Sequence, residues 1–188
     1  MGHMDQKWDN ENLELEIVLL LLKEESHIRG IAKNLGRPHS SISRALNKLV
    51  KESVLDYKIK GKNKVFFIKK NLQAKNYVFN AERYKLIKLI KIYPELGIII
   101  DEVLKRTNNM AILFGSYAKF SAKKDSDIDI YVETRSRKVK EEIESVNSRI
   151  RVKIGSFNLD SELIKEIIKN HVILKGIEEF YEKIKFFE

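Results

Sequence analysis

The sequence predicts an α+β protein, in which helices and a basic hairpin are followed by two further helices and a second part that contains strands. Three observations support this prediction. Apolar residues recur at helical spacing through most of residues 13–49 and alternate with polar residues on either side of Gly61. They also form two short continuous runs, at 110–114 and 128–132, which are typical of buried strands.

The composition indicates one large globular domain or two small ones. The chain has 188 residues, of which 43% are hydrophobic, enough to bury a core. Its longest apolar run, 17–22, is far shorter than the ~20 residues that a membrane span requires, so we expect no membrane partner. The absence of cysteine excludes disulfides and zinc–thiolate sites, and it agrees with the cytoplasmic location that we expect.

Positive charge is concentrated in one segment. Residues 26–70 contain 12 Lys or Arg against 2 Asp or Glu, whereas the whole chain carries a formal charge of +9. The remainder is therefore close to neutral. Because phosphate contacts supply much of the affinity for nucleic acid, this segment is predicted to bind a polyanion.

Three helices are predicted in this first part. Their expected ranges are about 10–23, capped by Asp9 or Asn10, then 28–35, and a third from His39 onward. The third helix carries an apolar stripe of Ile42, Ala45, Leu46 and Leu49. Its opposite stripe contains no acid, can donate hydrogen bonds to phosphates or base edges, and consists of Ser40, Ser43, Arg44, Asn47, Lys48 and Lys51.

A hairpin is predicted after the third helix. Apolar residues alternate along both strands, at Tyr57 and Ile59 and again at Val65 and Phe67, around a turn of Gly61-Lys62-Asn63. The positions expected to face outward are Lys58, Lys60, Lys62 and Lys64. So many like charges on one ribbon favour a function in binding over a structural one.

The segment IRGIAKNLGRPHSSISRALNKLVKESVLDYKIKGKNKVFFI resembles the winged helix-turn-helix family, and the resemblance covers about residues 5–72. It implies that the third helix enters the major groove of duplex DNA while the wing contacts the backbone. The implied DNA-binding residues are Ser40, Ser43, Arg44, Asn47, Lys48, Lys62 and Lys64. The alternative is a winged helix used only for protein contacts or dimerisation, which would have no need of this positive charge.

Residues 73–107 are predicted to form a helical connector. Apolar residues recur at helical spacing over 73–92, and Pro94 ends this helix and begins another over 95–106. We expect both helices to pack on the second domain and to carry no chemistry.

The segment LFGSYAKFSAKKDSDIDIYV joins the two predicted strands. On a strand, Asp127 and Asp129 share one face at ~7 Å backbone separation, with Ile128 and Ile130 facing the core. Two adjacent carboxylates repel each other unless a cation lies between them. Mg²⁺ suits such a pair, because it takes one or two carboxylates and completes its coordination with water and substrate phosphates.

Gly115 and Ser116 end the first of these strands. A glycine there lets backbone amides approach a phosphate closely, and the serine adds a hydroxyl donor. Lys119, Lys123 and Lys124 follow in the loop and could neutralise the remaining phosphate charge. The segment is therefore predicted to hold a nucleotide's phosphates at one end and a metal ion at the other.

A Gly-Ser pair, ten residues and Asp-x-Asp, each set against an apolar strand, resembles the minimal nucleotidyltransferases of the DNA polymerase beta superfamily. The resemblance covers about residues 108–188 and implies a small mixed sheet backed by helices. It further implies nucleoside triphosphate as substrate, Mg²⁺ as cofactor, and Asp127 and Asp129 as the catalytic and metal-binding residues. Nucleotide-binding residues implied by the same motif are Gly115, Ser116, Lys119 and Lys124. A surface loop with solvated aspartates is the alternative.

One feature of the family's pattern is missing. Family members usually carry a third carboxylate on the strand that follows the helix after the Asp-x-Asp strand. In this sequence that strand is 151–157, and it carries Arg151 and Lys153 in place of an acid. We expect Lys153, helped by Arg151, to replace that acid and to leave transfer slow or absent. The alternative is that Lys153 points into solvent or towards a phosphate. The acids that could approach from elsewhere are Glu133, Glu144 and Asp160.

Two functions therefore stay open. The first is transfer of a nucleoside monophosphate to a hydroxyl of a protein or nucleic acid, with DNA binding as a targeting function. The second is a transcriptional regulator whose transferase-like domain only senses nucleotide or binds a partner. The resemblance suggests a toxin-like helical protein as that partner.

Overall fold

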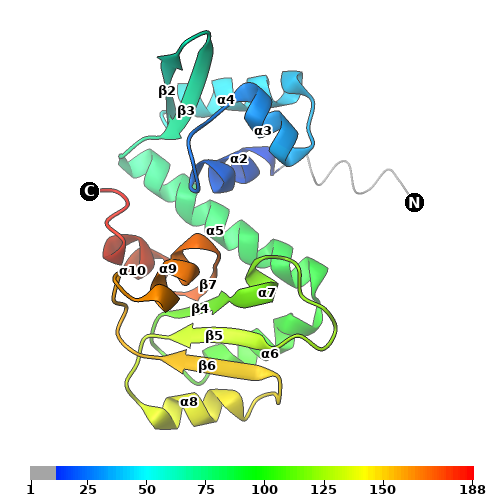
Figure 1. The fold of residues 1–188 in the computed structure, drawn as a ribbon, viewed down its shortest axis with the longest axis vertical. Helices are drawn as coiled ribbons and strands as arrows, with labels where there is room; N and C mark the ends of the chain where they lie inside the picture. Colours follow the sequence, from blue (N-terminus) through cyan, green and yellow to red (C-terminus); the bar gives the residue numbers. More distant parts are fainter. Residues whose placement is uncertain (1–11) are drawn as a thin grey trace. The chain divides into compact units, whose positions relative to one another are not determined.

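The computed structural model describes residues 12–188 and divides the chain into two compact units (Figure 1). The first unit consists of the residues up to Ala81 together with Phe187–Glu188, and the second spans Glu82–Phe186. The predicted caps Asp9 and Asn10 lie outside the described residues. No helix within residues 12–188 is long and apolar enough to cross a membrane.

Besides the beginning of the long helix that follows the hairpin, the described residues of the first unit form three helices and a small sheet. The helices are α2 (Leu13–Leu21), α3 (Ile28–Leu35) and α4 (His39–Lys51), as the apolar periodicity predicted. The sheet is antiparallel, with the order β1-β3-β2, and its strands are β1 (Ser26–His27), β2 (Leu55–Lys60) and β3 (Asn63–Ile68). Helix α3 stops at Gly36, whose φ of 62° is readily adopted by glycine.

Helix α4 buries the predicted apolar stripe. Ile42, Leu46 and Leu49 are completely inaccessible to solvent, and Ala45 is nearly so. These side chains recur every three or four residues, so they share one face of the helix and pack into the core of the first unit. The opposite face of α4 is consequently left at the surface.

The hairpin has a two-residue turn, which corrects the expected arrangement of its side chains. Lys60 pairs with Asn63, so only Gly61 and Lys62 form the turn. A glycine with φ of 59° at the first turn position is typical of a type II′ turn. The predicted three-residue turn was wrong, and the loss of one residue reverses the alternation of β3 relative to β2.

The reversal changes which side chains share a face. Tyr57 lies opposite Phe66, and Ile59 lies opposite Lys64. Phe66 and Ile68 are therefore the buried residues of β3, in place of Val65 and Phe67. Lys64 lies over the ring of Tyr57, with Nζ 4.2 Å from the ring centroid. Lys64 is thus on the opposite face from Lys58 and Lys60, and the four lysines do not form a single outward row.

Two helices follow the hairpin: α5 (Leu72–Ile92) and α6 (Glu95–Leu104). Both agree with the helices predicted on either side of Pro94. The first unit ends and the second begins within α5, between Ala81 and Glu82. In the second unit, Leu89 of α5 and Leu96 of α6 are completely buried.

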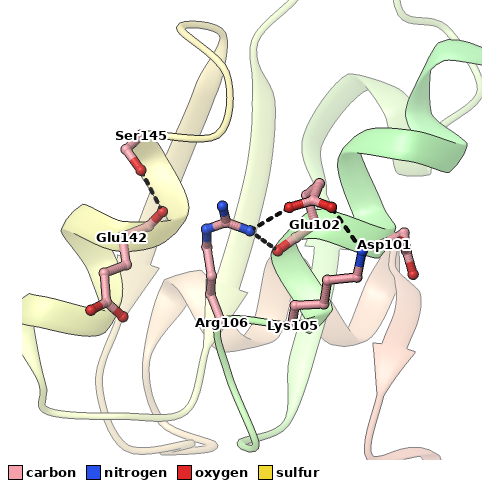
Figure 2. A network of polar contacts seen from close by, with 6 residues as sticks. All are labelled: Asp101, Glu102, Lys105, Arg106, Glu142 and Ser145. Atoms are coloured by element: carbon pink, nitrogen blue, oxygen red, sulfur yellow. Dashed lines mark hydrogen bonds and ion pairs between the residues drawn. The ribbon is translucent and has the colours of Figure 1, made fainter.

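Ion pairs surround the end of α6 (Figure 2). Lys105 Nζ lies 2.9 Å from Asp101 Oδ2 and 2.8 Å from Glu102 Oε1. Arg106 Nη1 donates to Glu102 Oε2 at 2.8 Å and also to the Glu102 carbonyl. The hydrogen bond from Lys105, followed by that from Arg106, lowers the pKa of Glu102 to about 2. Cations near the last turn complement the helix dipole and satisfy its free carbonyls.

The second unit is built on a four-stranded mixed sheet of order β6-β5-β4-β7 (Figure 1). Its strands are β4 (Ala111–Phe114), β5 (Ile128–Val132), β6 (Ile150–Ile154) and β7 (Val172–Lys175). Strand β4 is antiparallel to β5 and β7, whereas β5 and β6 are parallel. The predicted mixed sheet is confirmed.

The two faces of this sheet have different surroundings. Even-numbered residues of β5, such as Ile128 and Ile130, belong to a buried cluster with residues of α5, α6 and α8 (Arg137–Glu144). Asp129 and Tyr131 face the other way. There the ring of Tyr131 contacts Phe157, and Phe157 contacts Phe180 of α10 (Ile177–Lys183), with ring centroids 6.0 and 5.7 Å apart.

A buried polar cluster ties α5 to the end of the second unit. His171 follows α9 (Glu162–Lys169), and its Nδ1 donates to the carbonyl of Ile167 at 2.9 Å. Its Nε2 lies 3.3 Å from Glu82 Oε1, which also accepts a hydrogen bond from the Tyr181 hydroxyl at 2.9 Å. His171 is therefore a buried, hydrogen-bonded structural histidine.

Candidate functional site

Gly115 and Asp129 come together where β4 ends. Phe114 pairs with Asp129 across the two antiparallel strands, which puts the next residue, Gly115, against the aspartate side chain. A β-carbon on Gly115 would collide with Asp129 Oδ2 and stand 3.1 Å from its Cγ. Gly115 also has a φ of 71°, and it begins the short helix α7 (Gly115–Ala118). The positive φ favours glycine here, and any side chain at this position would force the Asp129 carboxylate to move.

The two predicted aspartates differ in environment. Asp127 is exposed just before β5, whereas Asp129 is half-buried on the strand. Partial burial raises the pKa of the Asp129 carboxyl, and the charges of Asp127 and Glu166 add to the rise. Positive charges on Lys153 and Arg151 oppose it. Positively and negatively charged side chains therefore both lie close to the Asp129 carboxylate.

Basic residues of β6 occupy the position at which the family's third carboxylate was expected. Because β5 and β6 are parallel, Asp129 lies beside Arg151 and Tyr131 lies beside Lys153. Arg151 Nη2 is 3.4 Å from Asp127 Oδ1, and Arg151 Nη1 donates to the Ser148 carbonyl at 2.7 Å. Arg151 thus makes the direct contact with the aspartate pair, while Lys153 acts on Asp129 through its charge.

The acids considered as replacements have other partners. Glu144 Oε1 accepts from the backbone amide of Val152 at 3.0 Å. Glu133 Oε1 accepts from Lys183 Nζ, also at 3.0 Å. Asp160 is exposed in the loop before α9. The charges that chiefly shift the pKa of Asp129 belong instead to Asp127, Glu166, Lys153 and Arg151.

Glu166 is the acid that sequence reasoning missed. It lies on α9, and its Oε1 is 3.1 Å from the ammonium of Lys119, which directly follows α7. Its negative charge also reaches Asp129. No local motif identifies Glu166, because it follows Asp129 by 37 residues and approaches the site only after α9 has packed against the sheet.

Arg149 organises the loop that carries the other predicted lysines. Its Nη1 donates to the Lys124 carbonyl at 2.7 Å and to the Tyr117 hydroxyl at 3.1 Å. The Lys124 backbone is thereby anchored near α7, and the side chains of Lys123 and Lys124 remain exposed. Arg149 was also missed, since its partners are more than twenty residues away in the sequence.

The donor set fits one magnesium ion and does not fit two. Asp127 and Asp129 supply two carboxylates, and Mg²⁺ commonly binds that number together with substrate phosphates. Within residues 12–188, no group of three or more His, Cys, Asp or Glu side chains could hold a metal. A second ion would lack its third carboxylate and would meet Arg151 and Lys153.

The residues predicted to bind DNA lie on α4 and the hairpin. Ser40, Arg44 and Asn47 are exposed, and Ser43 is half-buried. Lys48 Nζ is 2.9 Å from Glu14 Oε1 of α2, so it is already paired. Lys62 is exposed at the hairpin turn.

A basic cleft of about 620 Å³ lies beside these elements. It is lined by His27, Ile28, Arg29, His39, Lys62, Asn63 and Lys64. The structure therefore brings residues near the starts of α3 and α4 together with the hairpin turn. His27, Arg29 and His39 were not among the predicted DNA contacts, because their proximity to the turn depends on tertiary structure, including the pairing of His27 with Val65.

Comparison with known proteins concerns the second unit. Residues 99–179 match the family model described as Polymerase beta, Nucleotidyltransferase. The matched region contains all four strands of the mixed sheet, the Gly115-Ser116 pair and both aspartates. No curated protein and no solved structure matches the chain. This region is therefore nucleotidyltransferase-like, in agreement with the resemblance of its motif.

Proposed function

We propose that this protein is a DNA-binding nucleotidyltransferase that transfers a nucleoside monophosphate from a magnesium-bound triphosphate to a hydroxyl of a protein or nucleic acid. The observation that carries the proposal is the close approach of Gly115 to Asp129. The proposal is supported by this approach, because a site for a metal-bound nucleotide needs its phosphate-binding residues and its carboxylates close together. If the segment were only a surface loop with solvated aspartates, we would not expect Gly115 to approach the Asp129 side chain so closely.

Each residue of the motif has a distinct function in the proposed reaction. The Gly115 backbone and the Ser116 hydroxyl bind phosphate oxygens, while Asp127 and Asp129 hold the ion. A bound Mg²⁺ supplies positive charge to the phosphates. In the transfer, the acceptor hydroxyl oxygen bonds to the α-phosphorus as the bond to the bridging oxygen breaks, pyrophosphate leaves, and the hydroxyl proton is released to water. Lys119 and Lys124 provide further positive charge for the triphosphate.

We further propose that the first unit is a winged helix that binds duplex DNA. Support comes from the exposed face of α4, the basic hairpin turn and the cleft that joins them. Arg44 and Asn47 would contact base edges, and Lys62 and Lys64 would contact the backbone. DNA binding would then direct the transferase or regulate it.

A second candidate function is favoured by the Arg151–Asp127 ion pair. A guanidinium beside Asp127 offers no lone pair to a metal and cannot accept a proton. The second unit would then bind nucleotide, or a toxin-like helical protein, without efficient transfer. In that case the protein is a transcriptional regulator.

Calorimetry with each nucleoside triphosphate and magnesium tests the nucleotide site. Asp127→Asn is expected to weaken magnesium-dependent binding about tenfold or more, because an amide brings no charge to the ion. Asp125→Asn in the same exposed loop is the matched control and should bind like the wild type. Equal binding by Asp127→Asn and the wild type would show that the site is wrongly assigned.

Incubation with labelled nucleoside triphosphate, magnesium and a lysate of the source cells separates the two functions. A labelled band that requires Asp129 identifies both the activity and its acceptor. Nucleotide binding without any label in protein or nucleic acid favours the regulator.

A further inference from the structure

An ion pair holds Lys119 beside the candidate site. Lys119 Nζ lies 3.1 Å from Glu166 Oε1, which joins the end of α7 to α9. The two side chains keep 44% and 49% of their surfaces exposed. Water therefore screens the pair, and its contribution is small. The Lys119 ammonium can therefore leave Glu166 and bind a polyanion that attracts it more strongly.

Glu166 also acts on the site through its charge. After burial and the charge of Asp127, it is the next contributor to the raised pKa of Asp129. The Glu166 carboxylate is thus close enough for its charge to be felt at the proposed metal ligand. The Glu166 carboxylate repels phosphates, and it also neutralises the Lys119 ammonium that would attract them.

We propose that Glu166 is a built-in counter-ion that competes with phosphate for Lys119 and thereby lowers the affinity of the site for ligands that carry a triphosphate. The proposal rests on the proposed nucleotide-binding function of the second unit. A triphosphate is long and strongly charged, so it can reach Lys119 and displace the carboxylate. A monophosphate has less charge and leaves the ion pair intact. Glu166 acts through Lys119 and is therefore a positioning residue.

The test is calorimetry of Glu166→Gln with a nucleoside triphosphate and with the corresponding monophosphate, both with magnesium. Removing the competitor should tighten triphosphate binding about two- to fivefold, the range for an exposed ion pair. Monophosphate binding should change less. Glu162→Gln is the matched control, because Glu162 lies on the same helix, is more exposed and pairs with Lys165 of that helix at 2.7 Å. It should leave both affinities unchanged.

A double variant shows whether the effect passes through Lys119. Glu166→Gln should give a much smaller gain in a Lys119→Gln background, because no ammonium remains to be released and only the direct repulsion between the carboxylate and phosphate is relieved. A gain of the same size in both backgrounds, or no gain in the wild-type background, would overturn the proposal. A wild type that binds no triphosphate at all would overturn the proposed function as well, so the two failures are distinguishable.

Discussion

Gly115 leaves no space for a side chain against Asp129: a β-carbon would collide with Oδ2 and lie 3.1 Å from Cγ. The two residues are fixed by different elements, Gly115 by the end of β4 and Asp129 by β5, and the antiparallel register joins them. Small changes at Gly115 should therefore be felt at the carboxylate.

Gly115→Ala is expected to weaken nucleotide binding about tenfold or more, because displacing Asp129 misplaces the proposed metal ligand. Calorimetry measures the loss. Gly36→Ala is the control, since Gly36 has a similar φ of 62° and no atom within 4 Å of an added β-carbon. It should lose about 1 kcal/mol of stability from backbone strain alone and keep its nucleotide affinity. Wild-type affinity in Gly115→Ala would contradict the assignment.

Ser53→Gly is expected to stabilise the protein by about 1 kcal/mol. Ser53 has a φ of 59° just after α4, where the amide of Val54 donates to the Leu49 carbonyl at 2.9 Å. Glycine adopts this left-handed conformation with less strain. Chemical denaturation measures the gain. Ser53→Ala retains the strain and should leave stability almost unchanged, so an equal gain in both variants would exclude this explanation.

Lys62→Ala is expected to weaken binding to all duplex sequences about equally and to reduce the salt dependence of affinity by about one unit of slope. Arg44→Ala should instead cost about 1–3 kcal/mol of discrimination between sequences, because a base contact is lost. A gel-shift series across salt concentrations distinguishes the two effects. Absence of binding by the wild type at low salt would remove DNA from the proposed function.

Lys153→Asp is expected to raise the transfer rate about tenfold, equivalent to about 1.4 kcal/mol of barrier, by restoring an acid next to the aspartate pair. The rate is measured with magnesium on the acceptor that the lysate labelling reveals. Lys138→Asp on α8 is the control for the change in net charge, since Lys138 is 84% exposed and pairs with Glu142 on the same helix. A wild type with rapid turnover that loses activity in Lys153→Asp would contradict this account.

Acidification should lower the unfolding free energy of the second unit, because it protonates the Glu82 carboxylate. Burial by itself raises the pKa of this carboxyl, but the charges of Lys85 and His171 and two hydrogen bonds outweigh it and lower the pKa to about 2, from an ordinary 4.5. The stabilisation is therefore complete above pH 4.5 and is lost as the pH falls towards 2. This difference corresponds to about 3 kcal/mol of unfolding free energy.

Denaturant unfolding between pH 5 and 2 measures this effect. The wild type should lose stability over that interval more steeply than Glu82→Gln, which cannot titrate. Glu178→Gln is the control, because Glu178 is 57% exposed and its partner Arg83 is 3.7 Å away. Identical slopes for wild type and Glu82→Gln would show that Glu82 contributes nothing to the acid sensitivity.

Local patterns in the sequence were sufficient for the elements and for the motif. Helix α4 and strand β5 have the expected positions because apolar side chains at helical or alternating spacing must share one buried face. The Gly115-Ser116 pair and the two aspartates stood out because each adjoins an apolar strand. The hairpin was placed correctly but its alternation was not, since a single residue more or less in the turn reverses every side chain of β3.

The surroundings of the site were decided by tertiary structure alone. Arg151 meets Asp127 because β6 lies parallel to β5, and Glu166 reaches Lys119 because α9 packs against the sheet. These partners are 24 and 47 residues apart in the sequence. Spacing within a strand or helix fixes which side chains share a face, but contacts between elements depend on strand order and helix packing, which only the folded core selects.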